Sequence, residues 1–296
     1  AMTTPVIPGY LEKYAEPETS RYAEKVNQQY QYCLVVPMYD EPANCLARVL
    51  AHQAGQNCLV IAVVNVPRDA PPAALMRTRT LLSEAAAHAP VDVLIVDGVS
   101  EPFDPKAGVG LARKIGTDIA TALYAQGKLQ SPWLFQTDAD TELPQGYFTA
   151  RMPTAGAAVF AHTHHSDDKQ LALAADLYDQ HMAYYADGLT YARSSYAYPT
   201  LGSTIAVHAQ SYATVRGYPK RNAAEDFYLL NKVAKIAGVT QMASPVVRVE
   251  ARTSHRVPFG TGPALADICQ GLTSDPSGSF YQSYHPATFE MLREAL

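Results

Sequence analysis

Apolar and polar positions alternate in blocks along the first half of the chain. Short runs dominated by apolar residues occupy positions 32–38, 58–65, 91–97 and 132–138. Each run is too short for a typical helix and rich in β-branched or aromatic residues. Continuous apolar runs of this kind predict strands that are buried on both faces, as in a parallel sheet.

Segments with helical spacing separate these runs. Segment 40–53 carries apolar residues at helical intervals, 71–89 opens with prolines where a helix tolerates them best, and 108–127 is a third helical segment. Strands that alternate with helices are typical of βαβ units. The pattern therefore predicts an α/β fold, with a mostly parallel central sheet and helices on both faces.

The second half of the chain is less regular. Segments 157–162, 203–208 and 246–251 have the composition of strands, whereas 169–192 and 223–238 have helical spacing. No repeat and no linker interrupts them, which predicts that they complete the same domain.

These patterns predict a division of the chain into three parts. Residues 1–31 form a polar N-terminal arm, 32–262 form the main domain, and 263–296 form a C-terminal extension. The main domain divides into two parts, a regular part at 32–140 and a less regular part at 141–262.

Composition narrows the class of protein. Of 296 residues, 48% are apolar and 17% are charged, which is typical of a globular domain. A net charge of −5 argues against a nucleic-acid partner, because phosphate binding needs a basic face. The absence of an apolar run of 18 residues predicts no membrane span. The cysteines lack a CxxC pair and predict reduced thiols in a cytoplasmic protein; they are Cys33, Cys45, Cys58 and Cys269.

Two carboxylates directly follow the fourth apolar run. Asp138 lies at the carboxyl end of the predicted strand, and Asp140 lies just beyond it. Ligands of open α/β sheets bind at this end of the strands. Two carboxylates there repel each other unless a cation is near, and oxygen ligands favour Mg²⁺ or Mn²⁺. A bare Asp-x-Asp also occurs as a solvated turn after a strand, so the surrounding motifs matter.

Four motifs occur in an order that resembles the family 2 glycosyltransferases, which have the GT-A nucleotide-sugar-binding fold. The resemblance covers roughly residues 32–240. The matched positions are Pro37, Tyr39, Asp40 and Glu41 after the first strand, Gly108, Ala112, Arg113, Lys114 and Gly116 in a helix, Asp138 and Asp140, and then Gly217, Tyr218, Glu225 and Asp226.

The resemblance implies that the protein transfers a sugar from a nucleotide-sugar donor to a saccharide or small hydroxyl acceptor, with Mn²⁺ or Mg²⁺ as cofactor. It also implies that 32–140 is the nucleotide-binding half of the domain and 141–262 the acceptor-binding half. Asp140 is then the first metal ligand, and Asp138 contacts the ribose or a metal-bound water. The predicted donor-binding residues are Pro37, Tyr39, Glu41, Asn65, Arg113, Asp138, Gly202 and Arg256. Two positions depart from the family pattern: Asn65 stands where an aspartate holds the nucleobase, and Lys114 stands where asparagine is usual.

Glu225 and Asp226 open the predicted helix at 223–238. Carboxylates are stabilised at a helix N-terminus, so a capping role is one interpretation. The resemblance implies another, in which Asp226, with Glu225 as second choice, is the general base that takes the acceptor proton.

The segment 252–262 follows the last predicted strand and contains Arg252, His255 and Arg256. By resemblance, His255 is a third metal ligand. Arg256 is expected to pair with the diphosphate, because a guanidinium suits phosphate oxygens. Glycines in the segment suggest a loop that closes over the donor.

A second histidine group, His162, His164 and His165, lies at 160–165. It has neither an HExxH pattern nor a cysteine partner, which disfavours a zinc site.

The sequence thus predicts an inverting, non-processive transferase, since the Gln-x-x-Arg-Trp motif of processive synthases is absent. The alternatives are a retaining GT-A enzyme that makes a small glycoside and a non-catalytic nucleotide-sugar-binding domain. A nucleotidyltransferase is disfavoured, because no glycine-rich phosphate loop follows the first strand.

Overall fold

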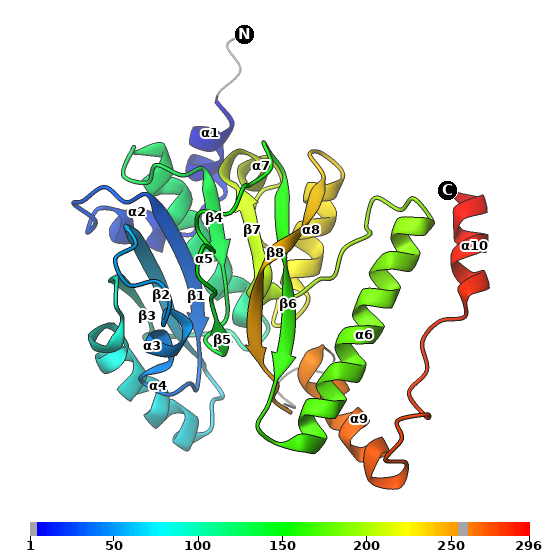
Figure 1. Ribbon diagram of the computed structural model, residues 1–296. Coiled ribbons are helices and arrows are strands. Elements are labelled where there is room, and N and C mark those ends of the chain that lie inside the picture. The colour runs from blue at the N-terminus through cyan, green and yellow to red at the C-terminus, as the bar shows by residue number, and fades with distance from the viewer. Residues whose placement is uncertain (1–4, 254–259) are drawn as a thin grey trace.

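The computed structural model describes residues 5–253 and 260–296. Its centre is one eight-stranded sheet in the order β3-β2-β1-β4-β7-β6-β8-β5 (Figure 1). The strands are β1 (Tyr32–Met38), β2 (Cys58–Pro67), β3 (Asp92–Phe103), β4 (Trp133–Gln136), β5 (Thr141–Glu142), β6 (Ala157–His165), β7 (Ile205–His208) and β8 (Val239–Glu250).

The sheet has a parallel half and a mixed half. Strands β3, β2, β1 and β4 run parallel to one another, as the four apolar runs predict. Strand β7 is antiparallel to β4 and β6, β6 and β8 are parallel, and β5 is antiparallel to β8. The predicted α/β fold with a mostly parallel sheet is confirmed.

Helices cover both faces of the sheet. The helices are α1 (Val6–Lys13), α2 (Glu18–Ala23), α3 (Cys45–Val49), α4 (Pro72–Glu84), α5 (Gly108–Ala125), α6 (Lys169–Tyr191), α7 (Ala209–Thr214), α8 (Glu225–Ala234), α9 (Thr261–Ser274) and α10 (Pro286–Ala295), with short 3-10 turns η1 (Ala85–His88) and η2 (Gly202–Thr204). Helices α1, α2, α5, α7 and α8 contribute to the core on one face, whereas α3, α4 and η1 contribute to the core on the other.

Strand β1 shows how the sequence builds two cores at once. Its side chains alternate in direction, so Cys33 and Val35 belong to one core and Leu34 and Val36 to the other. All four side chains are fully buried. A strand that is buried on both faces is apolar at every position, which explains the continuous run in the sequence.

The N-terminal arm contains two short helices. Helices α1 and α2 pack against α5, and α1 also packs against α7. On the mixed half of the sheet, α6 packs on β6, and α9 and α10 pack on α6 (Figure 1). A separate small core lies between α6 and α9 and includes Ala174, Leu265 and Ile268.

The helix expected over 40–53 is much shorter, with only α3 (Cys45–Val49) helical. Pro42 lies just upstream of it, and Gly55 has a positive φ of 81° downstream. Strand β8 is longer than the run 246–251 and begins at Val239, where many of its side chains are exposed. An exposed edge of this kind carries no apolar run for the sequence to reveal.

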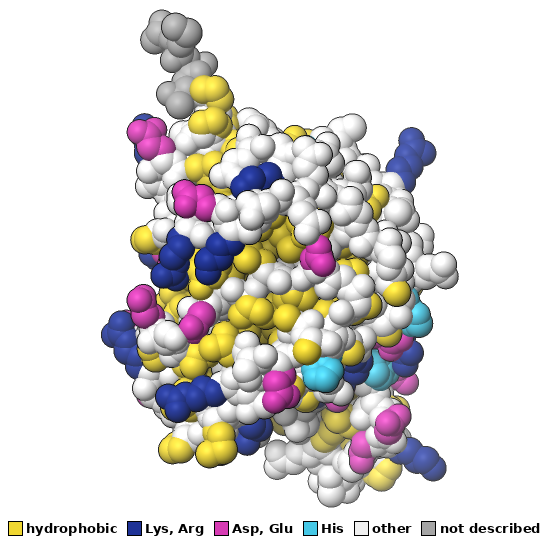
Figure 2. Space-filling view, turned by 90° about the vertical axis from the view of Figure 1, so that its left-hand side faces the viewer, with side chains coloured by type: hydrophobic (Ala, Val, Ile, Leu, Met, Phe, Trp, Pro, Cys, Tyr) yellow, Lys and Arg dark blue, Asp and Glu magenta, His cyan; other side chains and the backbone are white. Residues whose placement is uncertain are grey.

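Figure 2 shows the side of the molecule that lies at the left in Figure 1. Basic and acidic side chains are intermingled on this face, with apolar side chains between them. None of the described helices is long and apolar enough to cross a membrane. The described cysteines are free thiols, and Cys33, Cys45 and Cys58 are buried.

Candidate functional site

A cleft of about 1050 Å³ opens at the carboxyl ends of β1, β2 and β4, where ligands of open α/β sheets bind. All sequence-predicted site residues within the described part of the chain line it: Pro37, Tyr39, Glu41, Asn65, Arg113, Asp138, Asp140, Gly202, Glu225 and Asp226. The other two, His255 and Arg256, and most of the predicted closing loop lie outside the described residues.

The turn that carries Asp138 and Asp140 is held from both sides. The hydroxyl of Thr141 donates to the Asp138 carbonyl at 2.9 Å, and the Asp140 carbonyl accepts the backbone N–H of Glu250 at 2.8 Å. This fixes the chain between β4 and β5 and directs both carboxylates toward the cleft, which both residues line. The side chain of Asp138 is 35% exposed and that of Asp140 is 19% exposed.

A residue that the sequence analysis did not assign to the site neutralises Asp140. The guanidinium of Arg252 donates to Asp140 at 2.5 Å and forms a bidentate pair with Glu41 at 2.9 and 3.0 Å. Arg252 follows β8 and also lines the cleft. In the sequence, Arg252 stands out only as a member of the basic segment after the last strand. Nothing in that segment indicates that it pairs with Glu41 and Asp140.

Arg113 links the two walls of the cleft. It extends from α5 and is almost fully buried. Its Nε donates to Glu225 at 2.8 Å, and one terminal nitrogen donates to Asp138 at 2.7 Å. A Cβ on Gly202 would come within 2.4 Å of the guanidinium, so glycine at 202 makes room for Arg113.

Glu225 and Asp226 open α8 as predicted, but neither is the capping residue. The N-cap is Ala224, held in a left-handed conformation with a φ of 61°. Glu225 is buried, and this desolvation, together with the charge of Asp226, raises its pKa to about 7 despite the pairing with Arg113. Asp226 is half-buried, and its carboxylate accepts its neighbour's N–H, that of Phe227, at 2.7 Å. The two carboxylates therefore differ in environment although they are adjacent.

Asn65 lies near the end of β2, where the cleft continues toward β3. Its amide donates to the carbonyls of Met38 and Val63 at 3.3 and 3.2 Å. These bonds fix the amide plane against β1. Phe103, at the end of β3, also lines this part of the cleft and adds an apolar ring that the sequence analysis did not single out.

Lys114, the second departure from the family pattern, does not line the cleft. It points toward the N-terminal arm, where its ammonium donates to the Tyr10 hydroxyl at 2.8 Å, to the Tyr14 carbonyl at 2.8 Å and to Asp118 at 2.9 Å. Its role is to anchor α1 on α5.

No family model matches the chain, and no curated protein matches it. Among solved structures, it is similar to the mannosyltransferase PcManGT from Pyrobaculum calidifontis in complex with GDP-Man and Mn²⁺, with 16% identity and a TM-score of 0.44 over 99% of this chain and 78% of that one. It is similar to a mycobacterial protein with 10% identity and a TM-score of 0.39, over 90% and 80% of the chains. It is also similar to mouse xyloside xylosyltransferase 1 in its apo form, with 11% identity and a TM-score of 0.30, over 71% and 74%. At these TM-scores the similarity does not bear on activity.

Proposed function

We propose that the protein is a metal-dependent glycosyltransferase that moves one sugar from a nucleotide-sugar donor to an acceptor hydroxyl with inversion. The observation that carries this proposal is the cleft itself. It holds two carboxylate pairs in different environments, Asp138 with Asp140 at the end of β4 and Glu225 with Asp226 at the start of α8.

The β4 side of the cleft suits a divalent cation. Asp138 and Asp140 supply hard oxygen ligands and are both partly exposed to the cleft. Arg252 already pairs with Asp140, which shows that the position favours a positive charge. In this proposal Asp140 and Asp138 hold Mn²⁺ or Mg²⁺. The ion supplies charge neutralisation for a leaving diphosphate.

Arg252 then has a second role in the proposed reaction. Its guanidinium is held by Glu41 as well as Asp140, so it keeps one carboxylate partner when a metal occupies Asp140. Freed nitrogens of a guanidinium at the cleft wall suit the oxygens of a diphosphate. Glu41 thereby orients Arg252 in the donor-binding region.

Asp226 is the proposed general base. Glu225 is buried and bonded to Arg113, so it is less accessible to an acceptor. Asp226 lines the cleft and is half-buried, which allows contact with an acceptor hydroxyl. A single base opposite the leaving group is what inversion requires. Analysis of the anomeric configuration of the product distinguishes inversion from retention.

Binding of nucleoside diphosphates tests the donor site directly. Thermal unfolding of the full chain is measured with UDP, GDP and ADP, each with and without Mn²⁺. A ligand that binds only the native state raises the melting temperature. We expect one nucleotide to do so in a Mn²⁺-dependent manner. Asp140→Asn should abolish the Mn²⁺-dependent part.

The matched control is Asp167→Asn, which removes the same charge from an exposed position outside the cleft. This variant should behave as the wild type. A Mn²⁺-dependent shift of equal size in Asp140→Asn would reject the metal site, and no shift with any nucleotide would reject the donor site.

A further inference from the structure

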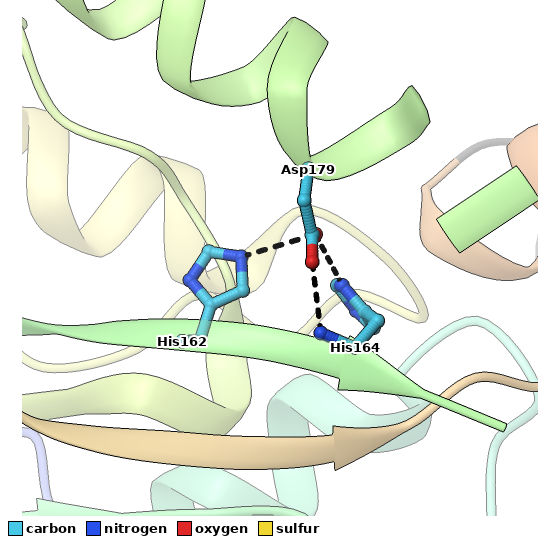
Figure 3. A group of neighbouring side chains, drawn as sticks. All are labelled: His162, His164 and Asp179. Carbon is cyan, nitrogen blue, oxygen red and sulfur yellow. Dashed lines mark hydrogen bonds and ion pairs between the residues drawn. The ribbon is translucent and has the colours of Figure 1, made fainter. Parts of the chain in front are cut away.

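A second group of metal-ligating side chains lies outside the cleft, between β6 and α6. His162 and His164 are two positions apart on β6 and therefore face the same side of the sheet. Asp179 extends toward them from α6 (Figure 3). One ligand atom from each of the three residues lies within 4.8 Å of the others.

Asp179 lies between the two imidazoles. One carboxylate oxygen is 2.6 Å from Nδ1 of His164 and 3.8 Å from Nε2 of His162. The other oxygen accepts the backbone N–H of His164 at 2.8 Å, which fixes the carboxylate on the strand (Figure 3). One ligand atom from each of the three residues thus lies in the same small space between the strand and the helix.

Burial makes this arrangement unusual for a surface ion pair. The side chain of His164 is fully buried, that of His162 is 7% exposed and that of Asp179 is 21% exposed. No lysine or arginine of the described chain pairs with Asp179. The buried Nε2 of His164 also has no hydrogen-bond partner among the described residues. Nδ1 of the same ring is hydrogen-bonded to Asp179 at 2.6 Å, so the ring is held on one side while its second nitrogen stays unpaired among the described residues.

The chemistry of the three ligands selects the metal. Two imidazoles and one carboxylate suit a borderline ion such as Zn²⁺, whereas Mg²⁺ and Mn²⁺ favour oxygen. Ligand atoms of a tetrahedral zinc site lie roughly 3.3 Å apart, given bonds of about 2.0–2.1 Å. Nδ1 of His164 and Nε2 of His162 lie 2.6 and 3.8 Å from one Asp179 oxygen, on either side of that value, so in this proposal the side chains of His164 and Asp179 move apart to admit the ion.

We propose that His162, His164 and Asp179 bind one Zn²⁺ ion, with the fourth position open on the partly exposed side of Asp179. The ion ties α6 to β6. Tyr178, which precedes Asp179, lines the cleft. Its ring contacts the His164 ring edge-on, with the ring centroids 5.9 Å apart. The zinc site thereby fixes Tyr178 in the wall of the cleft. The proposal does not depend on the proposed sugar transfer.

The test is metal binding by the full-length protein after removal of metal with a chelator. Zn²⁺ is titrated by calorimetry, and Co²⁺ is used as a spectroscopic substitute whose visible absorption reports four-coordinate imidazole ligation. We expect one equivalent of Zn²⁺ to bind the wild type and to raise its melting temperature. Asp179→Asn and His162→Gln should each weaken binding at least tenfold and lose the Co²⁺ absorption.

Two controls keep the result specific. His165→Gln removes the next imidazole on β6, which faces the other side of the sheet, and should bind Zn²⁺ normally. Asp140→Asn should also bind Zn²⁺ normally, although it loses the Mn²⁺-dependent nucleotide binding proposed above. The two sites can therefore fail separately.

The proposal is overturned if the wild type does not bind Zn²⁺. It is also overturned if Asp179→Asn and His162→Gln both bind Zn²⁺ as tightly as the wild type. The melting temperature of each metal-free variant shows whether it is folded. If one variant is unfolded, the other still decides the outcome, because the two changes lie on different elements, β6 and α6.

Discussion

Arg113 and Lys114 are neighbours on α5, yet each is the centre of a different ionic cluster. Lys114 belongs to a closed cluster with Asp118, Tyr10 and Tyr212 beneath the N-terminal arm. Arg113 belongs to a cleft cluster with Asp138 and Glu225. Both central side chains are almost completely buried, so burial alone does not separate a structural cluster from a functional one.

The two clusters differ in charge balance and in satisfaction of hydrogen bonds. In the closed cluster, two cations, Lys114 and Lys220, face two carboxylates, Asp118 and Glu16. Asp118 accepts from Lys114, from both tyrosine hydroxyls and from the backbone N–H of Glu16. In the cleft cluster, one guanidinium faces two carboxylates, and Nη1 of Arg113 has no hydrogen-bond partner among the described residues. A surplus of negative charge on the wall of a cleft is suited to a cation or to a proton taken from a substrate.

The largest expected effect comes from the carboxylate beside the cleft cluster. Asp226→Asn removes the proposed base, which should lower the transfer rate by about 10²–10⁴-fold. The melting temperature should stay near that of the wild type, because Ala224 rather than Asp226 is the N-cap of α8. Donor affinity should also be preserved, since the proposed base acts on the acceptor. Single-turnover assays give the transfer rate, and thermal unfolding with and without nucleotide gives the melting temperature and the donor affinity.

Transfer by Asp226→Asn at nearly the wild-type rate would show that Asp226 is not the base. Glu225→Gln would then be assayed in the same way, and the retaining mechanism would gain weight. Loss of stability without loss of rate would instead point to a structural role.

The next effect concerns the closed cluster. Lys114→Met leaves Asp118 buried without its cation, which should lower the free energy of unfolding by about 3–5 kcal/mol. Arg113→Met should cost less, because the side chain of Asp138 is 35% exposed and stays in contact with water, whereas that of Asp118 is fully buried. Urea denaturation of both variants at pH 7 makes the comparison. Equal losses in the two variants would contradict the distinction between the clusters.

The sequence predicts the parallel half of the fold well, for a physical reason. Strands β1, β2 and β4 and the first half of β3 are apolar runs between helices, and this property is local to a few residues. The start of β8 at Val239 was missed because that edge is largely exposed and its position depends on pairing with β6. The hydrophobic pattern within a segment does not reveal a strand whose position is set mainly by pairing with a neighbouring strand.

The same limit applies to the site. The motifs predicted which residues approach the cleft, because the carboxyl ends of parallel strands meet at one edge of the sheet. They did not predict that Arg252 pairs with Asp140, since 112 positions separate the two residues. Nor did they predict that Asp179 joins His162 and His164, because its place on α6 follows from the packing of that helix.

The pH dependence of stability should also separate the clusters. The pKa of Glu225 is raised to about 7 by burial and by Asp226, above its ordinary value of 4.5. Between these values the unfolded chain loses the proton while the folded protein keeps it. The free energy of unfolding should therefore fall as pH rises from about 4.5 to about 7, by on the order of 3 kcal/mol, and then level off.

Glu225→Gln, which still offers Arg113 an acceptor, should remove this part of the pH dependence. Urea denaturation of the wild type and the variant at several pH values between 4.5 and 8 measures the difference. Parallel curves would show that Glu225 ionises normally in the folded protein.

The smallest expected effect comes from two glycines, Gly202 and Gly116. Each is tightly packed, one against Arg113 of the cleft cluster and the other against the core beneath α5. An added Cβ would come within 2.4 Å of the Arg113 guanidinium at Gly202 and within 2.4 Å of the Val35 side chain at Gly116. Val35 lies in the packed core and cannot move without strain, so Gly116→Ala should cost about 1–3 kcal/mol of stability and leave nucleotide affinity unchanged.

The Arg113 guanidinium next to Gly202 borders the cleft and can shift into it. Gly202→Ala should therefore cost less stability but weaken Mn²⁺-dependent nucleotide binding by about tenfold, which corresponds to roughly 1.4 kcal/mol. Thermal unfolding and nucleotide titration of the two variants test both parts. If Gly202→Ala loses stability like Gly116→Ala and keeps its nucleotide affinity, Arg113 is held as rigidly as the core and the cleft cluster is structural.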